Sequence, residues 1–142
     1  MQSGTEGAGP APLVLICDDV EPIRRLLRIN LELAGFEVDE ASDGHAAMAR
    51  LIDPDRRRPD VIVLDSQMRP YDGWWAIAAI RGHHVLDDVP VLLVTAAASD
   101  HARFEVDEAG FDGIVTKPFD PDELVEAVSR LAASGRGPLR RP

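Results

Sequence analysis

Five short apolar runs, separated by stretches with helical spacing, constrain the fold of this chain more than any other feature. Three of the runs contain no polar residue, as expected of strands that are covered on both faces of a sheet. The runs are LVLIC (13–17), FEVDE (36–40, a weaker alternating pattern), VIVL (61–64), VLLV (91–94) and GIVT (113–116). Because strands and helices alternate, we predict an α/β fold, a five-stranded parallel sheet with helices on both faces.

Helical patterns fill the intervals between the runs. Apolar residues fall on one face of residues 21–35, where Pro22 suits the first turn and Gly35 suits the end. In residues 120–135, Asp120 is a candidate N-cap for a second clear helix. Three shorter helices are predicted at residues 43–52, 72–81 and 100–109.

The helix predicted at residues 72–81 carries two adjacent tryptophans, Trp74 and Trp75. Neighbouring positions on a helix point in different directions, so the two side chains do not face the same surface. We therefore expect one tryptophan in the core and the other at the surface, where it is available to a partner.

The two ends of the chain have the composition of tails around one compact domain. Residues 1–12 are rich in Gly, Ala and Pro, and we predict a disordered tail there. Residues 134–142 contain few core-forming residues and are interpreted as a flexible tail or the start of a linker. The remaining residues, 13–133, form the predicted domain, which is long enough to bury a sizeable core.

Composition narrows the setting in which the chain works. Its one cysteine, Cys17, excludes an internal disulfide and fits a reducing compartment. No apolar stretch is long enough to span a bilayer, and the N-terminus lacks the pattern of a secretory signal. The formal net charge of −10 argues against general affinity for nucleic acid. We therefore expect a cytoplasmic protein without direct contacts to membranes or nucleic acid.

Polar residues follow four of the apolar runs directly. Asp18 and Asp19 come after the first run, and Asp65 comes after the third. Thr95 and Lys117 come after the last two runs. Ligands of parallel α/β sheets collect beyond the carboxyl ends of the strands. We therefore expect three carboxylates, a hydroxyl and an ammonium group at one edge of the sheet.

This combination of groups indicates phosphoryl chemistry. Three clustered carboxylates repel one another unless one keeps a proton or a hard cation such as Mg²⁺ neutralises them. An ammonium and a hydroxyl group beside such a cation suit a tetrahedral dianion. A carboxylate inside the same pocket is placed to attack phosphorus and form an aspartyl phosphate. The predicted reaction is therefore phosphoryl transfer.

Short motifs in a fixed order carry a resemblance to a known family. DD follows the first strand, D-x-x-M and then DG follow the third, TA follows the fourth, and KPF follows the fifth. In this order, the sequence resembles the receiver domain of two-component response regulators over roughly residues 13–133. The resemblance implies a flavodoxin-like strand order, 2-1-3-4-5, and a stand-alone protein similar to the chemotaxis receivers.

The resemblance also assigns roles to the acidic residues. It implies that Asp65 accepts a phosphoryl group from a histidine kinase or a histidine phosphotransfer protein. Asp18, Asp19 and Asp65 would hold Mg²⁺ or Mn²⁺ together. The backbone carbonyl of Gln67 would complete the protein ligands.

Three further positions follow from the same resemblance. Lys117 would contact the phosphoryl group, and its bond to Pro118 is expected to be a cis peptide. Thr95 would turn inward to a phosphoryl oxygen and so transmit the modification to another surface. Receivers of this kind are two-state elements that a local change of charge biases.

The chain departs from the family pattern in its loops and near the fifth strand. Arg69 stands where the family usually has proline, and Pro70 comes next. Ile114 replaces an aromatic residue that changes orientation on phosphorylation, and Phe111 replaces a small residue. Ala97 occupies a position that influences the lifetime of the phosphoryl group in this family.

The function that we expect is a phosphorylation-dependent switch that acts through protein partners, with a phosphorylation-dependent dimer as one further expectation. It would not be a turnover enzyme, although it would assist its own phosphorylation and dephosphorylation. Three alternatives remain open: a receiver-like interaction module that is never phosphorylated, the N-terminal receiver part of a longer regulator, and a phosphatase or phosphotransferase. The enzyme would need a second acid or base near Asp65, which Ser66 and Gln67 do not supply.

Overall fold

The computed structural model of the chain describes residues 10–96 and 100–136. Our predictions for most of the N-terminal tail, for Ala97 and for residues 137–142 lie outside these ranges. Within them, no helix is long and apolar enough to cross a membrane.

The centre of the molecule is one parallel sheet of five strands. Its order is β2-β1-β3-β4-β5, which confirms the predicted flavodoxin-like arrangement. The strands are β1 (Leu13–Cys17), β2 (Glu37–Ala41), β3 (Val61–Asp65), β4 (Val91–Thr95) and β5 (Gly113–Thr116). β3 and β4 are one residue longer than predicted, so Asp65 and Thr95 are the last residues of their strands.

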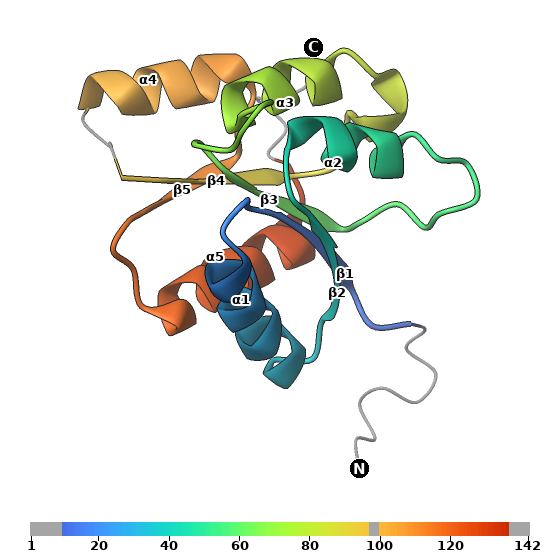
Figure 1. Cartoon of the computed structure of the whole chain (residues 1–142), viewed down its shortest axis with the longest axis vertical. Helices are drawn as coiled ribbons and strands as arrows, with labels where there is room; N and C mark the ends of the chain where they lie inside the picture. Colours follow the sequence, from blue (N-terminus) through green and yellow to red (C-terminus); the bar gives the residue numbers. More distant parts are fainter. Residues whose placement is uncertain (1–9, 97–99, 137–142) are drawn as a thin grey trace.

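Helices cover both faces of this sheet, as Figure 1 shows. α1 and α5 lie together on one face, whereas α2, α3 and α4 lie on the other. Their bounds are α1 (Glu21–Leu33), α2 (Gly44–Leu51), α3 (Gly73–Arg81), α4 (Asp100–Ala109) and α5 (Pro121–Ser134), and a short 3-10 turn, η2 (His84–Leu86), follows α3. The five predicted helices are therefore confirmed to within two residues at each end.

Aspartate side chains define where three of the helices begin. In each case the carboxylate accepts a hydrogen bond from a backbone N–H of the first turn, which would otherwise lack a partner. The capping residues are Asp43 for α2, Asp72 for α3 and Asp120 for α5. α1 begins differently, because its N-cap residue, Val20, has an aliphatic side chain that offers no acceptor.

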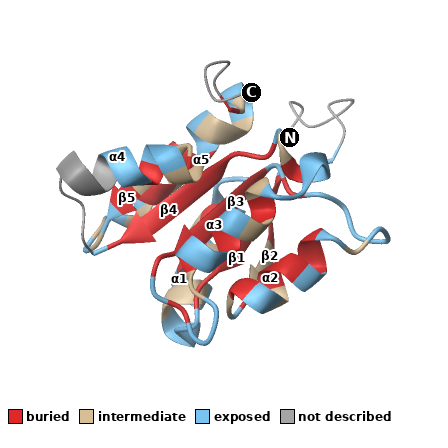
Figure 2. Ribbon diagram, turned by 90° about the horizontal axis from the view of Figure 1, so that it is seen from above, coloured by how far each residue is buried: buried red, intermediate tan, exposed pale blue. Residues whose placement is uncertain are grey.

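The alternation of side chains along the central strands produces two cores, one on each face of the sheet. In β1, Val14 and Ile16 pack with residues of α1 and α5, whereas Leu15 and Cys17 pack with residues of α2 and α3. Every residue of β1, β3 and β4 is buried, as the red strands of Figure 2 show. This accounts for the apolar runs of the sequence, because a strand covered on both faces has no solvent-facing side.

The prediction that one of the two tryptophans lies in the core is wrong. Both are half-buried, with exposed fractions of 38% for Trp74 and 39% for Trp75. The ring of Trp74 meets Phe111 edge to face at 5.5 Å, and that of Trp75 packs against Tyr71 at 4.7 Å. Each indole therefore finds an aromatic partner at the rim of the core rather than inside it.

The packed part of the chain continues to Arg136, past the predicted boundary at residue 133. Gly135 has a positive φ of 65°, which ends α5 and turns the chain toward the sheet. Arg136 is buried, and its guanidinium donates to the Asp112 carboxylate at 2.9 Å and to the Asp87 carbonyl at 2.9 Å. Asp112 also binds Arg81 at 3.0 Å. This cluster lies at the end of the sheet where β4 and β5 begin.

Candidate functional site

Asp65 occupies the carboxyl end of the central strand β3, with its side chain only 3% exposed. The Nζ atom of Lys117 donates to both of its carboxylate oxygens, at 3.1 Å and 3.0 Å. The backbone N–H of Gln67 donates to one of them at 3.1 Å. The structure thus brings the predicted lysine and Asp65 together, although they are 52 residues apart in the sequence.

Asp18 and Asp19 reach the same place from the end of β1. One carboxylate oxygen of each, and one of Asp65, lie within 4.8 Å of one another. Asp18 is buried and accepts a hydrogen bond from the Val20 N–H at 2.8 Å. Asp19 is exposed and accepts one from the Arg69 N–H at 3.3 Å. Three carboxylates from two strand ends therefore form one cluster.

The crowding of these groups changes the acidity of Asp18. The pKa of Asp18 is raised from 3.8 to about 6, mainly by burial and in part by the neighbouring Asp65 carboxylate, while the Val20 N–H and Lys117 oppose the change. Burial also raises the pKa of the Cys17 thiol, which remains protonated and unreactive beside the cluster. Asp18 thus holds a proton more readily than an ordinary aspartate does.

The donor set suits a hard divalent cation. Mg²⁺ prefers oxygen ligands and is usually bound by one or two carboxylates that leave room for waters and phosphate oxygens. The cluster provides one buried and one exposed carboxylate in addition to Asp65, at the open edge of the sheet. A cation here would also remove the repulsion that raises the pKa of Asp18. The residues present therefore fit the predicted metal.

Thr95 ends β4 beside Asp65, and its side chain is buried. Its hydroxyl oxygen accepts a hydrogen bond from the Ser66 hydroxyl at 3.0 Å. Its backbone carbonyl accepts from the Lys117 N–H at 2.8 Å. From the sequence we weighed Ser66 only as an acid or base and missed this contact. The adjacency of Asp65 and Val94 across β3 and β4 is what brings the two hydroxyls together.

Two cis peptide bonds border the site. One joins Lys117 to Pro118, and the other joins Arg69 to Pro70. The second lies where the sequence departs from the family pattern, and the same loop supplies the Arg69 N–H that contacts Asp19. The other two departures from the family pattern, Phe111 and Ile114, lie just before β5 and within it. Phe111 is fully buried, and Ile114 packs against the core on the α3 and α4 face.

Gly73 sets the distance between α3 and the strand that carries Asp65. A Cβ atom at this position would lie 2.5 Å from the Asp65 carbonyl oxygen and 3.1 Å from the Ser66 Cα. The Gly73 N–H also donates to the Ser66 carbonyl at 3.3 Å. Glycine therefore permits the close approach of backbone to backbone behind the site.

We expect Gly73→Ala to displace the Asp65 backbone and to lower the free energy of unfolding by about 1–3 kcal/mol, because the added methyl group overpacks a backbone contact. Urea unfolding measures this loss. Gly82→Ala, at the other end of α3, is the matched control, since its Cβ would meet backbone oxygens only at 3.4 Å and 3.5 Å. Equal stability of the two variants would contradict the role assigned to Gly73.

Comparison with known proteins agrees with this geometry. The family model of the response regulator receiver domain matches residues 14–129, which include the acidic cluster and all five strands except for Leu13, the first residue of β1. The chain belongs to the response regulator receiver domain family. Receiver domains are signalling domains of two-component systems and do not form a typical enzyme family.

The relatives of this receiver domain include several transcriptional regulators. The chain is 39% identical to the transcriptional regulatory protein PrrA of Mycobacterium leprae over 121 residues, which are 85% of this chain and 50% of PrrA. It is 33% identical to the phosphate regulon transcriptional regulatory protein PhoB of Pseudomonas aeruginosa over 130 residues, which are 91% of this chain and 56% of PhoB. The chain thus spans about half the length of the curated relatives it matches.

Solved structures of response regulators superimpose on most of this receiver domain. A response regulator from Chloroflexus aurantiacus superimposes with a TM-score of 0.78 at 30% identity, covering 88% of this chain and 99% of that one. The chemotaxis response regulator CheY4 of Vibrio cholerae gives a TM-score of 0.78 at 31% identity, covering 85% and 98%. Both agree with the observed strand order.

Proposed function

We propose that this receiver domain is a phosphorylation-activated switch, which accepts a phosphoryl group on Asp65 from a histidine kinase or a histidine phosphotransfer protein. The observation that carries the proposal is the contact of both Asp65 carboxylate oxygens with Lys117 inside a cluster of acidic residues. A buried carboxylate beside an ammonium group and two other carboxylates is suited to accept a phosphoryl group, whose negatively charged oxygens the ammonium group and a bound cation would stabilise.

In the proposed reaction, an oxygen of Asp65 forms a bond to phosphorus as the bond between phosphorus and the donor nitrogen breaks. The electron pair of the broken bond goes to the leaving nitrogen. Lys117, which contacts the carboxylate before reaction, would then pair with the phosphoryl oxygens. The Thr95 hydroxyl, which accepts from the Ser66 hydroxyl, would turn to donate to one of these oxygens once the phosphoryl group is present.

Asp18, Asp19, Asp65 and the backbone carbonyl of Gln67 would hold the Mg²⁺ or Mn²⁺ ion in this proposal. The bound cation supplies positive charge that offsets the charge of the transferring group. Asp18 contributes to its binding only when it has lost its proton, as metal ligands in general must. The acidity of Asp18 therefore makes cation binding depend on pH.

We expect the affinity for Mg²⁺ to rise about tenfold between about pH 5 and about pH 7 and to level off above, because Asp18 loses its proton over this range. The stability of the metal-free fold changes with pH in the opposite direction to the affinity for Mg²⁺. A carboxyl whose folded pKa is raised stabilises the metal-free fold at low pH, and this contribution is lost as pH rises through about 6. Calorimetric titration with MgCl₂ at several pH values measures the affinity. Asp18→Asn is expected to remove most of the pH dependence, and an unchanged profile in this variant would refute the assignment.

The proposed output is a contact with protein partners, including a second copy of the domain, rather than turnover of a substrate. The coverage of the relatives favours a second candidate, in which this domain is the receiver part of a longer regulator of transcription. Gel filtration of the phosphorylated and unphosphorylated protein tests whether the output is pairing with a second copy of the domain. A switch that controls dimerisation would elute earlier after phosphorylation.

The buried, protonated Cys17 thiol is compatible with a cytoplasmic location.

Acetyl phosphate, a small phosphodonor, tests whether the domain accepts a phosphoryl group at all. We expect incubation with acetyl phosphate and Mg²⁺ to add the mass of one phosphoryl group to the intact protein. Chelation of the cation with EDTA is expected to suppress the adduct. An unchanged mass in the presence of Mg²⁺ would favour the alternative in which the domain is an unphosphorylated interaction module.

A further inference from the structure

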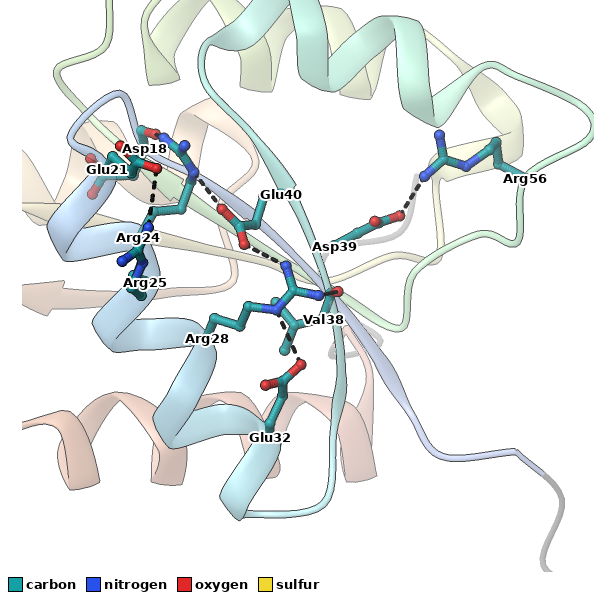
Figure 3. A network of polar contacts seen from close by, with 10 residues as sticks. All are labelled: Asp18, Glu21, Arg24, Arg25, Arg28, Glu32, Val38, Asp39, Glu40 and Arg56. Carbon is teal, nitrogen blue, oxygen red and sulfur yellow. Dashed lines mark hydrogen bonds and ion pairs between the residues drawn. The ribbon is translucent and has the colours of Figure 1, made fainter.

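A network of hydrogen bonds and ion pairs connects the turn of Asp18 with the edge strand β2, as Figure 3 shows. Arg24, in the second turn of α1, donates through Nη1 to the backbone carbonyl of Asp18 at 2.7 Å. Its Nε donates to the Glu40 carboxylate at 2.6 Å. Both side chains are largely buried, with exposed fractions of 16% and 26%. One guanidinium group therefore joins the turn after β1 to the strand at the edge of the sheet.

The other oxygen of the Glu40 carboxylate is also occupied. It accepts a hydrogen bond from Arg28, one turn further along α1. Arg28 in turn donates to the Val38 carbonyl at 3.1 Å and pairs with Glu32 at 3.1 Å. Glu40 is thus held between two arginines, and its position on β2 fixes where Arg24 can reach.

The turn that carries Asp18 and Asp19 leads into α1 without a capping side chain. The N-cap residue of α1 is Val20, whereas aspartates cap α2, α3 and α5. The Asp18 N–H donates to the Ala41 carbonyl at 3.1 Å, and the Asp18 carboxylate accepts from Val20. The contact from Arg24 therefore holds the peptide that lies between the two candidate metal ligands, Asp18 and Asp19.

We propose that Arg24, held by Glu40, is a positioning residue for the cation site. It binds the Asp18 carbonyl and so fixes the direction in which the Asp18 and Asp19 carboxylates project. Hydrogen-bond partners behind metal ligands act in this way in many proteins, and their loss typically weakens metal binding by one or two orders of magnitude. This inference rests on the proposed function, because it takes the acidic cluster as the cation site.

The arginine acts by geometry rather than by its charge. Its positive charge is paired with Glu40, so the pair adds little net charge near the cluster. A lysine at this position would keep the charge but would lose the planar fork that reaches two acceptors at once. Arg24→Lys is therefore expected to behave more like Arg24→Ala than like the unmodified protein.

Titration of each metal-free variant with MgCl₂ alone tests the proposal. We expect Arg24→Ala to bind Mg²⁺ about tenfold more weakly, because the turn is no longer held. Arg28→Ala is the matched control, since it removes an arginine from the same helix and from the same glutamate. We expect its affinity to remain within about twofold of that of the unmodified protein, because Arg28 does not contact the turn. Equal weakening in the two variants would overturn the proposal and leave Arg24 a purely structural residue.

Amide hydrogen exchange provides a second readout that needs no cation. We expect the Val20 N–H, which donates to the Asp18 carboxylate, to exchange faster in Arg24→Ala than in Arg28→Ala. An unchanged exchange rate would overturn the positioning role. If the unmodified protein binds no Mg²⁺, the proposed cation site fails, and the Val20 exchange rate still decides whether Arg24 orders the turn.

Discussion

Asp65→Asn is expected to abolish the phosphoryl adduct completely while leaving the fold intact. An amide at this position lacks the nucleophilic carboxylate oxygen that forms the bond to phosphorus. The substitution also removes the ion pair with Lys117, but it relieves the repulsion between Asp65 and Asp18. Because these two effects oppose each other and the Lys117 side chain is 33% exposed, so that solvent compensates its charge, we expect the unfolding free energy to change by no more than about 1 kcal/mol. Intact mass after incubation with acetyl phosphate and Mg²⁺, together with urea unfolding, measures both effects.

Asp55→Asn is the matched control for this experiment. Asp55 carries the same functional group but lies exposed in the loop between α2 and β3. Its substitution is expected to leave the phosphoryl adduct at the level of the unmodified protein. A full adduct in Asp65→Asn would show that another residue is the acceptor, and loss of the adduct in both variants would point to an unspecific effect.

Asp112→Ala is expected to cause a larger loss of stability than Gly73→Ala. The Asp112 side chain is only 3% exposed and accepts hydrogen bonds from Arg81, Arg136 and the Val91 N–H. Removing one partner of a buried ion pair typically costs about 3–5 kcal/mol, because the remaining charge stays buried without compensation. Urea unfolding should show this decrease, which is a large part of the stability of an ordinary domain.

Asp60→Ala provides the comparison for Asp112. Just as Asp112 binds the first N–H of β4, Asp60 binds the first N–H of a neighbouring strand, because its carboxylate accepts from the Leu13 N–H of β1 at 2.8 Å. It also pairs with Arg57 at 3.3 Å. Its side chain, however, is 47% exposed. Because solvent compensates an exposed carboxylate and its partners, we expect this substitution to cost only about 1 kcal/mol. Similar losses in both variants would contradict the role assigned to the buried charge cluster.

The elements of the fold were predictable because their patterns are local and strong. The uninterrupted apolar runs of β1, β3 and β4 follow from burial on both faces, and the capping aspartates mark the helix starts. The site was predictable for a related reason. Asp18, Asp65 and Lys117 follow strands of one parallel sheet, so their convergence depends on topology and not on the details of packing.

Contacts that depend on register or on helix packing could not be read from the sequence. The hydrogen bond between Ser66 and Thr95 requires the pairing of β3 with β4. The ion pair between Arg24 and Glu40 requires α1 to lie across the edge strand β2. Arg136 was assigned to a tail because the residues around it lack core-forming side chains. Its burial depends on Asp112, which lies 24 residues away in sequence. Such long-range polar pairs leave no periodic signal.

The central claim is that Asp65 carries the phosphoryl group, and mapping the modified carboxylate tests it most directly. The protein is phosphorylated with acetyl phosphate and Mg²⁺ and then treated with borohydride, which reduces an acyl phosphate of aspartate to the alcohol homoserine. Tandem mass spectrometry of the peptides locates the reduced residue. We predict homoserine at position 65 alone, with Asp18 and Asp19 unmodified. Reduction at Asp18 or Asp19, or an unreduced Asp65 in a protein that has gained the phosphoryl mass, would contradict the claim.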